Sequence, residues 1–214
     1  MDSPEIVFRY FPNPDPEVRT KIEALGPLFD ELNRKVNLIS RKDIDFFYER
    51  HVLYSLAIAR VISFSPGTRV LDVGTGGGFP AIPLAIMFPE VNFFPVDSIK
   101  KKIRAVQELK ENLGLENVFP QNIRAEAMEG KFDFVVSRAV TEIPVLMGWI
   151  KKKIRGKVKN DLLPGLLYLK GGDLSADVRK YGKRMQVFPV KEMYQEEFFE
   201  TKALIYLPVS GANS

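Results

Sequence analysis

The chain has 214 residues and no cysteine, and its 31 Lys and Arg exceed its 27 Asp and Glu to give a net charge of +4. This size supports one mid-sized domain with a helical appendage, and a hydrophobic content of 45% excludes global disorder. The missing cysteine excludes disulfides, zinc–thiolate sites, iron–sulfur clusters and cysteine nucleophiles, and the single histidine excludes a metal site built from several histidines.

Residues 1–65 predict an N-terminal helical extension. Apolar residues recur at helical spacing over 18–36, and Asp15 is placed to cap this helix. Pro27 is expected to kink or split it, because proline lacks a backbone N–H. A second helical stretch is predicted over about 43–63.

From residue 66 to residue 214, short apolar runs alternate with amphipathic helices. Strands are predicted at 69–73, 91–96, 118–121, 132–137, 166–170, 186–190 and 202–207, and helices at 80–88, 98–113 and 142–153. This alternation predicts an α/β domain with a parallel sheet covered on both faces. The last two strands could pair antiparallel, which would make a mixed seven-stranded sheet.

The first strand runs into Gly74-Thr75-Gly76-Gly77-Gly78-Phe79, the arrangement of a nucleotide-binding loop. Glycine lets a ligand lie against bare backbone, and the start of the following helix offers free N–H groups. A dinucleotide fingerprint would need glycine where Phe79 stands, and a Walker A lysine is absent. The G-x-G-x-G pattern after Asp72 instead resembles the first motif of class I S-adenosylmethionine (AdoMet)-dependent methyltransferases.

Three further loops at strand ends complete the expected site. Asp97, followed by Ser98, ends the second strand and can accept hydrogen bonds from both hydroxyls of a ribose. Arg124-Ala125-Glu126 follows the third strand, where a backbone N–H could reach an adenine nitrogen. Ser137-Arg138-Ala139 ends the fourth strand, which in this fold faces the methyl donor and the acceptor.

The composition of that last loop restricts the reaction. Methyltransferases that act on exocyclic amines usually carry a Pro-Pro tetrapeptide there, and the chain contains no Pro-Pro. Carbon methylation of pyrimidines usually needs a cysteine. The acceptor must then be nucleophilic at neutral pH or be activated otherwise, and N7 of guanine fits because its lone pair needs no general base. We expect Arg138 to position the cofactor carboxylate or an RNA phosphate rather than to move a proton.

Together these residues resemble the RsmG (GidB) family of bacterial 16S ribosomal RNA guanine-N7 methyltransferases. The motifs are DVGTGGGFPAIPL over 72–84, Val-Asp-Ser followed by basic residues over 96–101, and Ser-Arg-Ala over 137–139. The resemblance implies the α/β fold of class I AdoMet-dependent methyltransferases. It also implies AdoMet as cofactor, S-adenosylhomocysteine as product and 16S ribosomal RNA or the small ribosomal subunit as partner. The expected cofactor-binding residues are Gly74, Thr75, Gly76, Gly78, Phe79, Asp97, Ser98, Ala125, Glu126 and Arg138, and Arg138 is also the catalytic candidate.

Two positions depart from the pattern of that family. Ala81 replaces the usual glycine, inside a predicted helix that should tolerate it. In the segment of the type Arg-His-x-x-Asp-Ser, here residues 50–55, Tyr54 replaces the aspartate. Any role of that aspartate in orienting the histidine or touching RNA is therefore in doubt here. We expect His51 to be a packing residue rather than a catalyst.

The positive charge is unevenly placed, with net −1 over residues 1–63 and net +5 over residues 64–214. This distribution favours an anionic partner, although many charge runs are only solvated faces. The expected RNA-binding residues are Lys100, Lys101, Lys102, Arg104, Lys151, Lys152, Lys153 and Arg155, with Lys157, Lys159, Arg41, Lys42 and Arg50 as further candidates.

We also expect a monomer in the cytoplasm, with no membrane segment and no metal. No apolar run approaches the ~18–20 residues that span a bilayer, and the acidic, proline-broken N-terminus is unlike a signal peptide. Three alternatives stay open: a small-molecule methyltransferase on the same fold, a regulatory protein that binds AdoMet without catalysis, and an NAD-dependent oxidoreductase, which Phe79 disfavours. Transfer of a methyl group to RNA would distinguish them.

Overall fold

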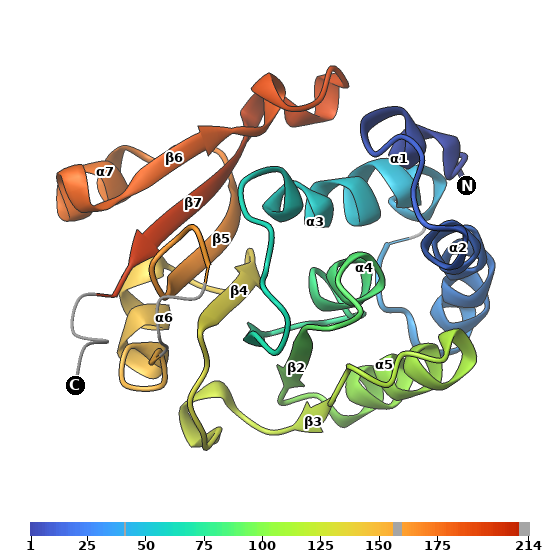
Figure 1. Cartoon of the computed structure of the whole chain (residues 1–214), viewed down its shortest axis with the longest axis horizontal. Helices are drawn as coiled ribbons and strands as arrows, with labels where there is room; N and C mark the ends of the chain where they lie inside the picture. Colours follow the sequence, from blue (N-terminus) through green and yellow to red (C-terminus); the bar gives the residue numbers. More distant parts are fainter. Residues whose placement is uncertain (41, 156–159, 210–214) are drawn as a thin grey trace.

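Over the residues that the computed structural model describes, 1–40, 42–155 and 160–209, seven strands form one mixed sheet in the order β3-β2-β1-β4-β5-β7-β6 (Figure 1). They are β1 (Arg69–Val73), β2 (Asn92–Asp97), β3 (Gln121–Asn122), β4 (Phe134–Arg138), β5 (Gly165–Gly171), β6 (Gln186–Pro189) and β7 (Lys202–Pro208). Strands β1 to β5 are parallel, and β7 runs antiparallel to both β5 and β6. The predicted mixed α/β sheet is confirmed.

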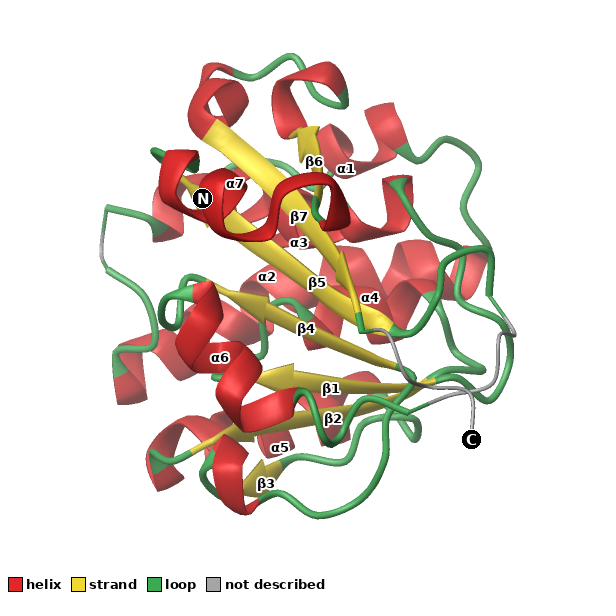
Figure 2. Cartoon of the chain, turned by 90° about the vertical axis from the view of Figure 1, so that its left-hand side faces the viewer, coloured by secondary structure: helices red, strands yellow, loops and turns green. Residues whose placement is uncertain are grey.

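Helices cover both faces of this sheet (Figures 1 and 2). One face carries α4 (Ala81–Met87), α5 (Lys100–Leu113) and the N-terminal helices α1 (Glu5–Tyr10), α2 (Pro16–Val36) and α3 (Tyr54–Leu56). The other face carries α6 (Ile143–Ile150) and α7 (Ser175–Tyr181). Short 3₁₀ helices lie at Ile44–Phe46, Ile58–Arg60, Ala125–Ala127, Gly182–Arg184, Val190–Glu192 and Glu197–Thr201.

The N-terminal helices share one apolar core with the sheet. Phe29 of α2 and Phe47 are fully buried, with ring centroids 4.8 Å apart. The ring of Phe79, which follows β1, lies 5.3 Å from that of Phe29. The same cluster continues into Val70 of β1 and Phe134 of β4. Residues from the first 65 therefore pack directly against the glycine loop and the sheet.

Two predicted elements are shorter in the structure. The third strand is only Gln121–Asn122, and Val118 makes a single bridge to Phe93 instead of opening the strand. Helix α6 ends at Ile150, three residues before the predicted end. The chain turns there because the Lys153 N–H donates back to the Ile150 carbonyl oxygen at 2.7 Å.

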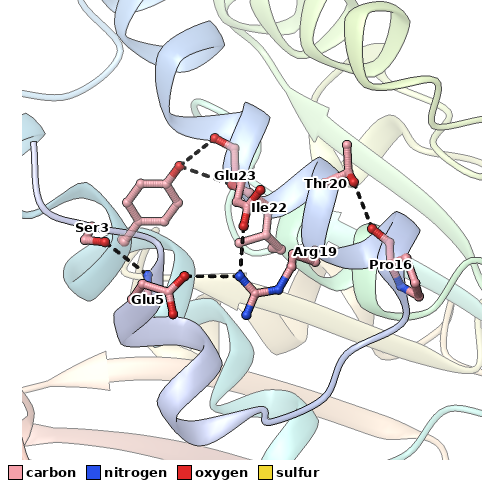
Figure 3. Close-up of polar contacts among 8 residues, drawn as sticks. Ser3, Glu5, Pro16, Arg19, Thr20, Ile22 and Glu23 are labelled. Atoms are coloured by element: carbon pink, nitrogen blue, oxygen red, sulfur yellow. Dashed lines mark hydrogen bonds and ion pairs between the residues drawn. The ribbon is translucent and has the colours of Figure 1, made fainter.

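Helix α2 is one continuous helix with Pro27 inside it, so the predicted split does not occur. Asp15 caps it as predicted, because its carboxylate accepts from the Glu17 N–H at 2.8 Å. Pro27 leaves the Glu23 carbonyl without its helical donor. The buried hydroxyl of Tyr48 lies 3.0 Å from that oxygen and 3.1 Å from the Ile22 carbonyl oxygen, and both acceptor residues are labelled in Figure 3. A partner from outside the helix thus replaces the lost donor.

The second predicted helix is a run of turns with different pitch rather than one α-helix. A π-helix over Tyr48–Leu53 lies between the 3₁₀ turn Ile44–Phe46 and helix α3. The carboxylate of Asp2 accepts from the N–H groups of Tyr48 and Glu49 at 2.9 and 2.8 Å, which satisfies the start of the π-helix. π-Helical turns are rare and often lie at functional sites.

Helices α1 and α2 are also joined at their exposed surface. The guanidinium of Arg19 in α2 lies 3.1 Å from the Glu5 carboxylate of α1 and 2.9 Å from the Glu23 carboxylate (Figure 3). Exposed ion pairs of this kind are screened by solvent and contribute little to stability. The buried contact of Tyr48 therefore matters more to this corner of the fold.

Replacing Tyr48 with Phe should lower the free energy of unfolding by about 1–3 kcal/mol, because a buried carbonyl loses its donor. The measurement is urea unfolding of four proteins: the wild type, Tyr48→Phe, Pro27→Ala and the double variant. In the Pro27→Ala background, residue 27 again has a backbone N–H that can donate to the Glu23 carbonyl. Tyr48→Phe should therefore lower the free energy of unfolding by less in that background than in the wild type. An equal loss of unfolding free energy in both backgrounds would show that the Tyr48 hydroxyl does not compensate for the N–H that Pro27 lacks.

Candidate functional site

A cavity of about 520 Å³ opens at the carboxyl edge of β1, β2 and β4. In the strand order, β1 lies between β2 and β4. The chain adds β2 and β3 on one side of β1 and then crosses to the other side to add β4, so the direction of the strand order reverses at β1. Open α/β sheets bind ligands at this switch point. The lining residues are Leu38, Ile39, Val73, Gly74, Thr75, Gly76, Gly77, Phe79, Val96, Asp97, Ser98, Lys102, Ile123, Arg124, Ala125, Glu126, Arg138, Ala139, Val140 and Trp149.

The glycine loop forms the floor of this cavity. Gly74 and Gly76 have φ values of 67° and 58°, a region that residues with a side chain rarely adopt. The N–H groups of Gly74 and Thr75 both donate to the Val96 carbonyl, at 2.9 and 3.1 Å, which fixes the loop on β2. A Cβ atom added to Gly76 would meet nothing within 4 Å, so the loop leaves open space beside its backbone.

One expectation about this loop is wrong, and the predicted cofactor contact of Gly78 stays a prediction. The start of α4 does not offer free N–H groups, because Ala81 donates to the Asp72 carboxylate at 3.2 Å and Ile82 donates to the Gly78 carbonyl at 2.7 Å. Gly78 does not line the cavity. Its φ is 99°, and an added Cβ would lie 2.6 Å from Cγ1 of Ile82. Gly78 is therefore needed for the turn and for packing.

Asp97 faces the cavity from the carboxyl end of β2, as the sequence predicts. One carboxylate oxygen accepts from the Ile99 N–H at 2.8 Å and the other from the Gly76 N–H at 3.2 Å. Lys102 of α5 places its ammonium 3.9 Å from the same carboxylate. Lys102 was predicted to bind RNA, but it lines the cavity beside Asp97 and Ser98.

The opposite wall comes from the loop after β3 and from α6. Ala125 and Glu126 begin a 3₁₀ helix, and the first N–H groups of a helix have no partner within it. Both residues line the cavity, as predicted. Trp149 of α6 also lines it, and sequence reasoning missed this residue because its position in an apolar helix did not distinguish it from a core residue.

Leu38 and Ile39 close the cavity from the N-terminal side and were also missed as site residues. The side-chain oxygen of Asn33 accepts from their N–H groups at 2.7 and 2.9 Å. Asn37 ends α2 in the left-handed conformation, with φ of 54°. The family resemblance, which begins at residue 37, was the available signal for this segment.

Arg138 is held at the tip of β4 by the N-terminal π-helix. Its guanidinium donates to the Arg50 carbonyl at 3.3 Å and lies 3.0 Å from Nδ1 of His51. The Phe79 ring centroid is 5.3 Å from the guanidinium carbon. Because a guanidinium only donates, Nδ1 of His51 accepts, and the proton of the neutral ring is on Nε2. Sequence reasoning chose Arg138 but did not anticipate its partners.

His51 is buried and neutral at physiological pH. Burial, reinforced by the charge of Arg138, lowers the pKa of His51 to about 3. The His51 ring packs against the rings of Phe79 and Phe47, whose centroids lie 5.4 and 6.1 Å from its own. Tyr54, which stands where the family has aspartate, has a buried hydroxyl without a hydrogen-bond partner among the described residues, and burial raises the pKa of Tyr54. Among the described residues, the Tyr54 hydroxyl therefore makes no hydrogen bond to the His51 ring.

The residues beside Arg138 fix the end of β4. The Ser137 hydroxyl donates to the Val73 carbonyl at 2.8 Å, which ties β4 to β1. Ala139 adopts a φ of 49°, a strained conformation for a residue with a side chain. Val140 then contacts Gly74 closely enough to exclude any side chain there. Strained backbone of this kind clusters at functional sites.

Asp72 lies beneath the glycine loop and is fully buried. Desolvation raises the pKa of its carboxyl to about 7, although the hydrogen bond from Ala81 and the charge of Arg138 both oppose the shift. Burial conversely lowers the pKa of Arg138. A buried carboxylate beneath the glycine loop and a half-buried guanidinium on the cavity wall therefore lie close enough for their charges to influence each other.

The predicted RNA-binding cations do not form one group. Lys100, Lys101, Arg104, Lys151, Lys152 and Arg155 are exposed, whereas Lys157, Lys159 and the further candidate Arg41 lie outside the described residues. Lys153 is different, because its ammonium donates to the carbonyl oxygens of Glu126 and Met128 at 3.0 and 2.6 Å. It fixes the loop after β3 instead of facing solvent.

Among the described residues, no group of three or more His, Asp or Glu is arranged to hold a metal ion. The same residues include no helix that is both long and apolar enough to cross a membrane.

Comparison with known proteins identifies a family for this architecture. A model of the GidB family, described as rRNA small subunit methyltransferase G, matches residues 19–204. Proteins named ribosomal RNA small subunit methyltransferase G match almost end to end. That of Christiangramia forsetii is 49% identical over 96% of this chain and 97% of its own. That of Cytophaga hutchinsonii is 47% identical over 95% of this chain and 99% of its own.

Solved structures with much lower identity share the fold. A SAM-dependent methyltransferase from Aquifex aeolicus gives a TM-score of 0.57 at 15% identity, over 85% of this chain and 98% of that chain. A mutant of MtNAS in complex with S-adenosylmethionine gives 0.56 at 14% identity, over 89% and 75%. The fold is that of class I AdoMet-dependent methyltransferases.

The imidazole of His51 should not titrate between pH 8 and pH 5, because its pKa in the folded protein is lowered to about 3. The chain has a single histidine, so ¹⁵N NMR of that ring can follow both nitrogens without overlap. Nδ1 should stay unprotonated and Nε2 protonated throughout.

The matched control is the same protein in urea, where the ring should titrate near its ordinary value of about 6.5. Since the folded pKa is the lower one, the contribution of His51 to stability is complete above about 6.5 and is lost as pH falls towards about 3. A folded-state midpoint near 6.5 would contradict the buried acceptor role.

Proposed function

Because the chain belongs to the GidB family of rRNA small subunit methyltransferases, we propose that it transfers a methyl group from AdoMet to N7 of a guanine in 16S ribosomal RNA. The observation that carries this proposal is the single cavity that brings together the glycine loop, Asp97, the loop at Ala125 and Arg138. We also propose that the enzyme acts as a monomer in the cytoplasm.

The residues around the cavity fit AdoMet by their chemistry. The carboxylate of Asp97 supplies acceptors for a ribose diol, and the N–H groups of Ala125 and Glu126 supply donors for an adenine ring. The open space beside Gly76 accommodates a ligand against the backbone. Arg138 provides a cation for a carboxylate. When bound, AdoMet supplies an activated methyl group on its sulfonium, and S-adenosylhomocysteine remains after transfer.

The protein's own contribution is alignment rather than proton transfer. N7 of guanine carries a free lone pair, so no side chain has to remove a proton from it. His51 agrees with this chemistry, since its one accepting nitrogen already binds Arg138. Holding two reactants in line can supply ~7–11 kcal/mol of the barrier. Arg138 is thus a positioning residue held between β4 and the π-helix.

The exposed cationic side chains next to the cavity are candidates for binding the phosphates of the RNA backbone. Lys100, Lys101 and Arg104 lie on the first turns of α5, directly after the Asp97 loop. Lys151 and Lys152 follow α6, which carries Trp149 on the cavity wall. Lys102 and Lys153 are weaker candidates because their ammonium groups already contact the protein, and their role in RNA binding stays a prediction.

The proposed activity is tested by incubating the protein with AdoMet labelled in the methyl group and with either undermethylated small subunits or naked 16S ribosomal RNA. The expected result is one labelled guanine, with the label at N7 when the nucleoside is analysed. Label that enters a small metabolite but never RNA would reject the proposal, as would AdoMet binding without any transfer.

Changing Lys151 and Lys152 together to Gln should weaken RNA binding and flatten its dependence on salt. Each lost contact to a single-stranded phosphate should reduce the slope of log K against log[salt] by about 0.7. The measurement is equilibrium binding of naked 16S ribosomal RNA from low to moderate salt, with AdoMet affinity as the internal control. An unchanged slope would show that this run only faces solvent.

A further inference from the structure

Two aromatic and two basic side chains alternate along one side of the site, and we name them the aromatic–cation ladder: Phe46, Arg50, Phe198 and Lys202. The guanidinium carbon of Arg50 lies 3.9 Å from the Phe46 ring centroid and 5.2 Å from that of Phe198. The ammonium of Lys202 lies 4.7 Å from the Phe198 centroid. The ladder joins the segment around the π-helix to the start of β7, some 150 residues later along the chain.

The ladder touches the candidate active site directly. The backbone carbonyl of Arg50 accepts from Arg138, which lines the cavity. Lys202 pairs with Gly171 at the carboxyl end of β5, so it lies at the same edge of the sheet. In the sheet order, β4 separates the cofactor-binding loops of β1 and β2 from β5 and β7. The ladder therefore lies on the side of Arg138 away from those loops.

The ladder is packed into the protein at Phe198 and exposed at Phe46. Phe198 packs against Tyr54 and Phe199, with ring centroids 5.9 and 5.2 Å away. Phe46 at the other end is 41% exposed. Arg50 covers one face of the Phe46 ring, and the exposed part of the side chain stays accessible to a ligand.

The charge of the ladder favours contact with a base rather than with a phosphate. Arg50 is paired with Asp43 at 3.3 Å and lies 4.0 Å from the Glu49 carboxylate. These two carboxylates offset the positive charge of Arg50. What remains exposed is a ring face, which stacks on any nucleobase.

We propose that the exposed ring of Phe46 stacks an unpaired base of the RNA substrate next to the methylated guanine. This inference rests on the proposed function, since it takes RNA as the substrate. Sequence-specific RNA recognition targets unstacked bases in loops and stacks them on aromatic rings and guanidinium planes. The ladder combines these two groups beside the residue that positions the reaction.

The chain contains a matched control for this surface. Phe119 is 40% exposed, and the ammonium of Lys110 lies 5.6 Å from its ring centroid. Phe94 of β2 stacks on it at 5.2 Å and is covered in turn by Arg69, the first residue of β1, at 4.4 Å. This second group has the same composition but lies towards the amino end of β1, away from Arg138.

The test compares Phe46→Ala with Phe119→Ala in two assays on naked, unmodified 16S ribosomal RNA: equilibrium binding and the KM for methyl transfer. Phe46→Ala should weaken binding and raise KM by about fivefold or more, the lower limit for losing one stacked base, while AdoMet affinity stays unchanged. Phe119→Ala should change neither by more than about twofold. Phe46→Trp should retain binding, whereas Phe46→Leu should behave like Ala because it lacks a ring.

Normal RNA binding by Phe46→Ala, or full activity of Phe46→Leu, would overturn the proposal. A defect of Phe46→Ala that is seen only with assembled subunits would also overturn the proposal, because Phe46 would then contact a ribosomal protein rather than an RNA base. A wild-type protein that binds RNA but transfers no methyl group would reject the proposed function alone, since the binding assay still decides the role of Phe46. A wild-type protein that does neither would reject both.

Discussion

The contact between Arg138 and the N-terminal π-helix is the constraint on which the rest of the site depends. Arg138 projects from the end of β4, and its guanidinium needs acceptors inside a largely dry environment. The Arg50 carbonyl and Nδ1 of His51 supply them at 3.3 and 3.0 Å. The Arg50 carbonyl and the His51 ring both belong to the π-helix Tyr48–Leu53, so one short segment supplies both acceptors.

The same contact makes the N-terminal helices part of the site. Phe29 and Phe47 pack on Phe79, and Gly77 must lack a side chain because an added Cβ would lie 2.9 Å from the Phe29 ring. Leu38 then closes the cavity on the side of the N-terminal helices. The first 65 residues thus contribute walls and acceptors to the cavity.

The electrostatics of the floor follow from burial. Asp72 and Arg138 are both desolvated, which moves their pKa values towards the neutral forms, and each partly offsets the other through its charge. His51 between the aromatic rings is neutral for the same reason. A cavity with balanced internal charge suits a reaction in which alignment matters more than proton transfer.

The sequence predicted the sheet and the cofactor loops well, because apolar periodicity and glycine spacing are local properties. Asp97, Ala125 and Glu126 could be placed at the cavity for the same reason, since Asp97 ends β2 and the other two lie shortly after β3. The contacts that were missed join distant segments. Trp149 looked like a core residue of an apolar helix, and Pro27 looked like a helix breaker until Tyr48 supplied a donor from another element.

The ligand contact suggested by the motif position of Gly78 stays a prediction, because its φ and its packing against Ile82 already require glycine there. The free N–H groups expected at the start of α4 were similarly taken by Asp72 and by the loop itself.

The most direct test of the positioning role is Arg138→Lys, measured by single-turnover methyl transfer to unmodified 16S ribosomal RNA. Lysine keeps the charge but lacks the planar fork that reaches the Arg50 carbonyl and His51 together. If Arg138 acts by being held in place, the rate should fall at least tenfold while the thermal midpoint changes little. A rate equal to that of the wild type would show that charge alone suffices and that the contact with the π-helix does not position the reaction.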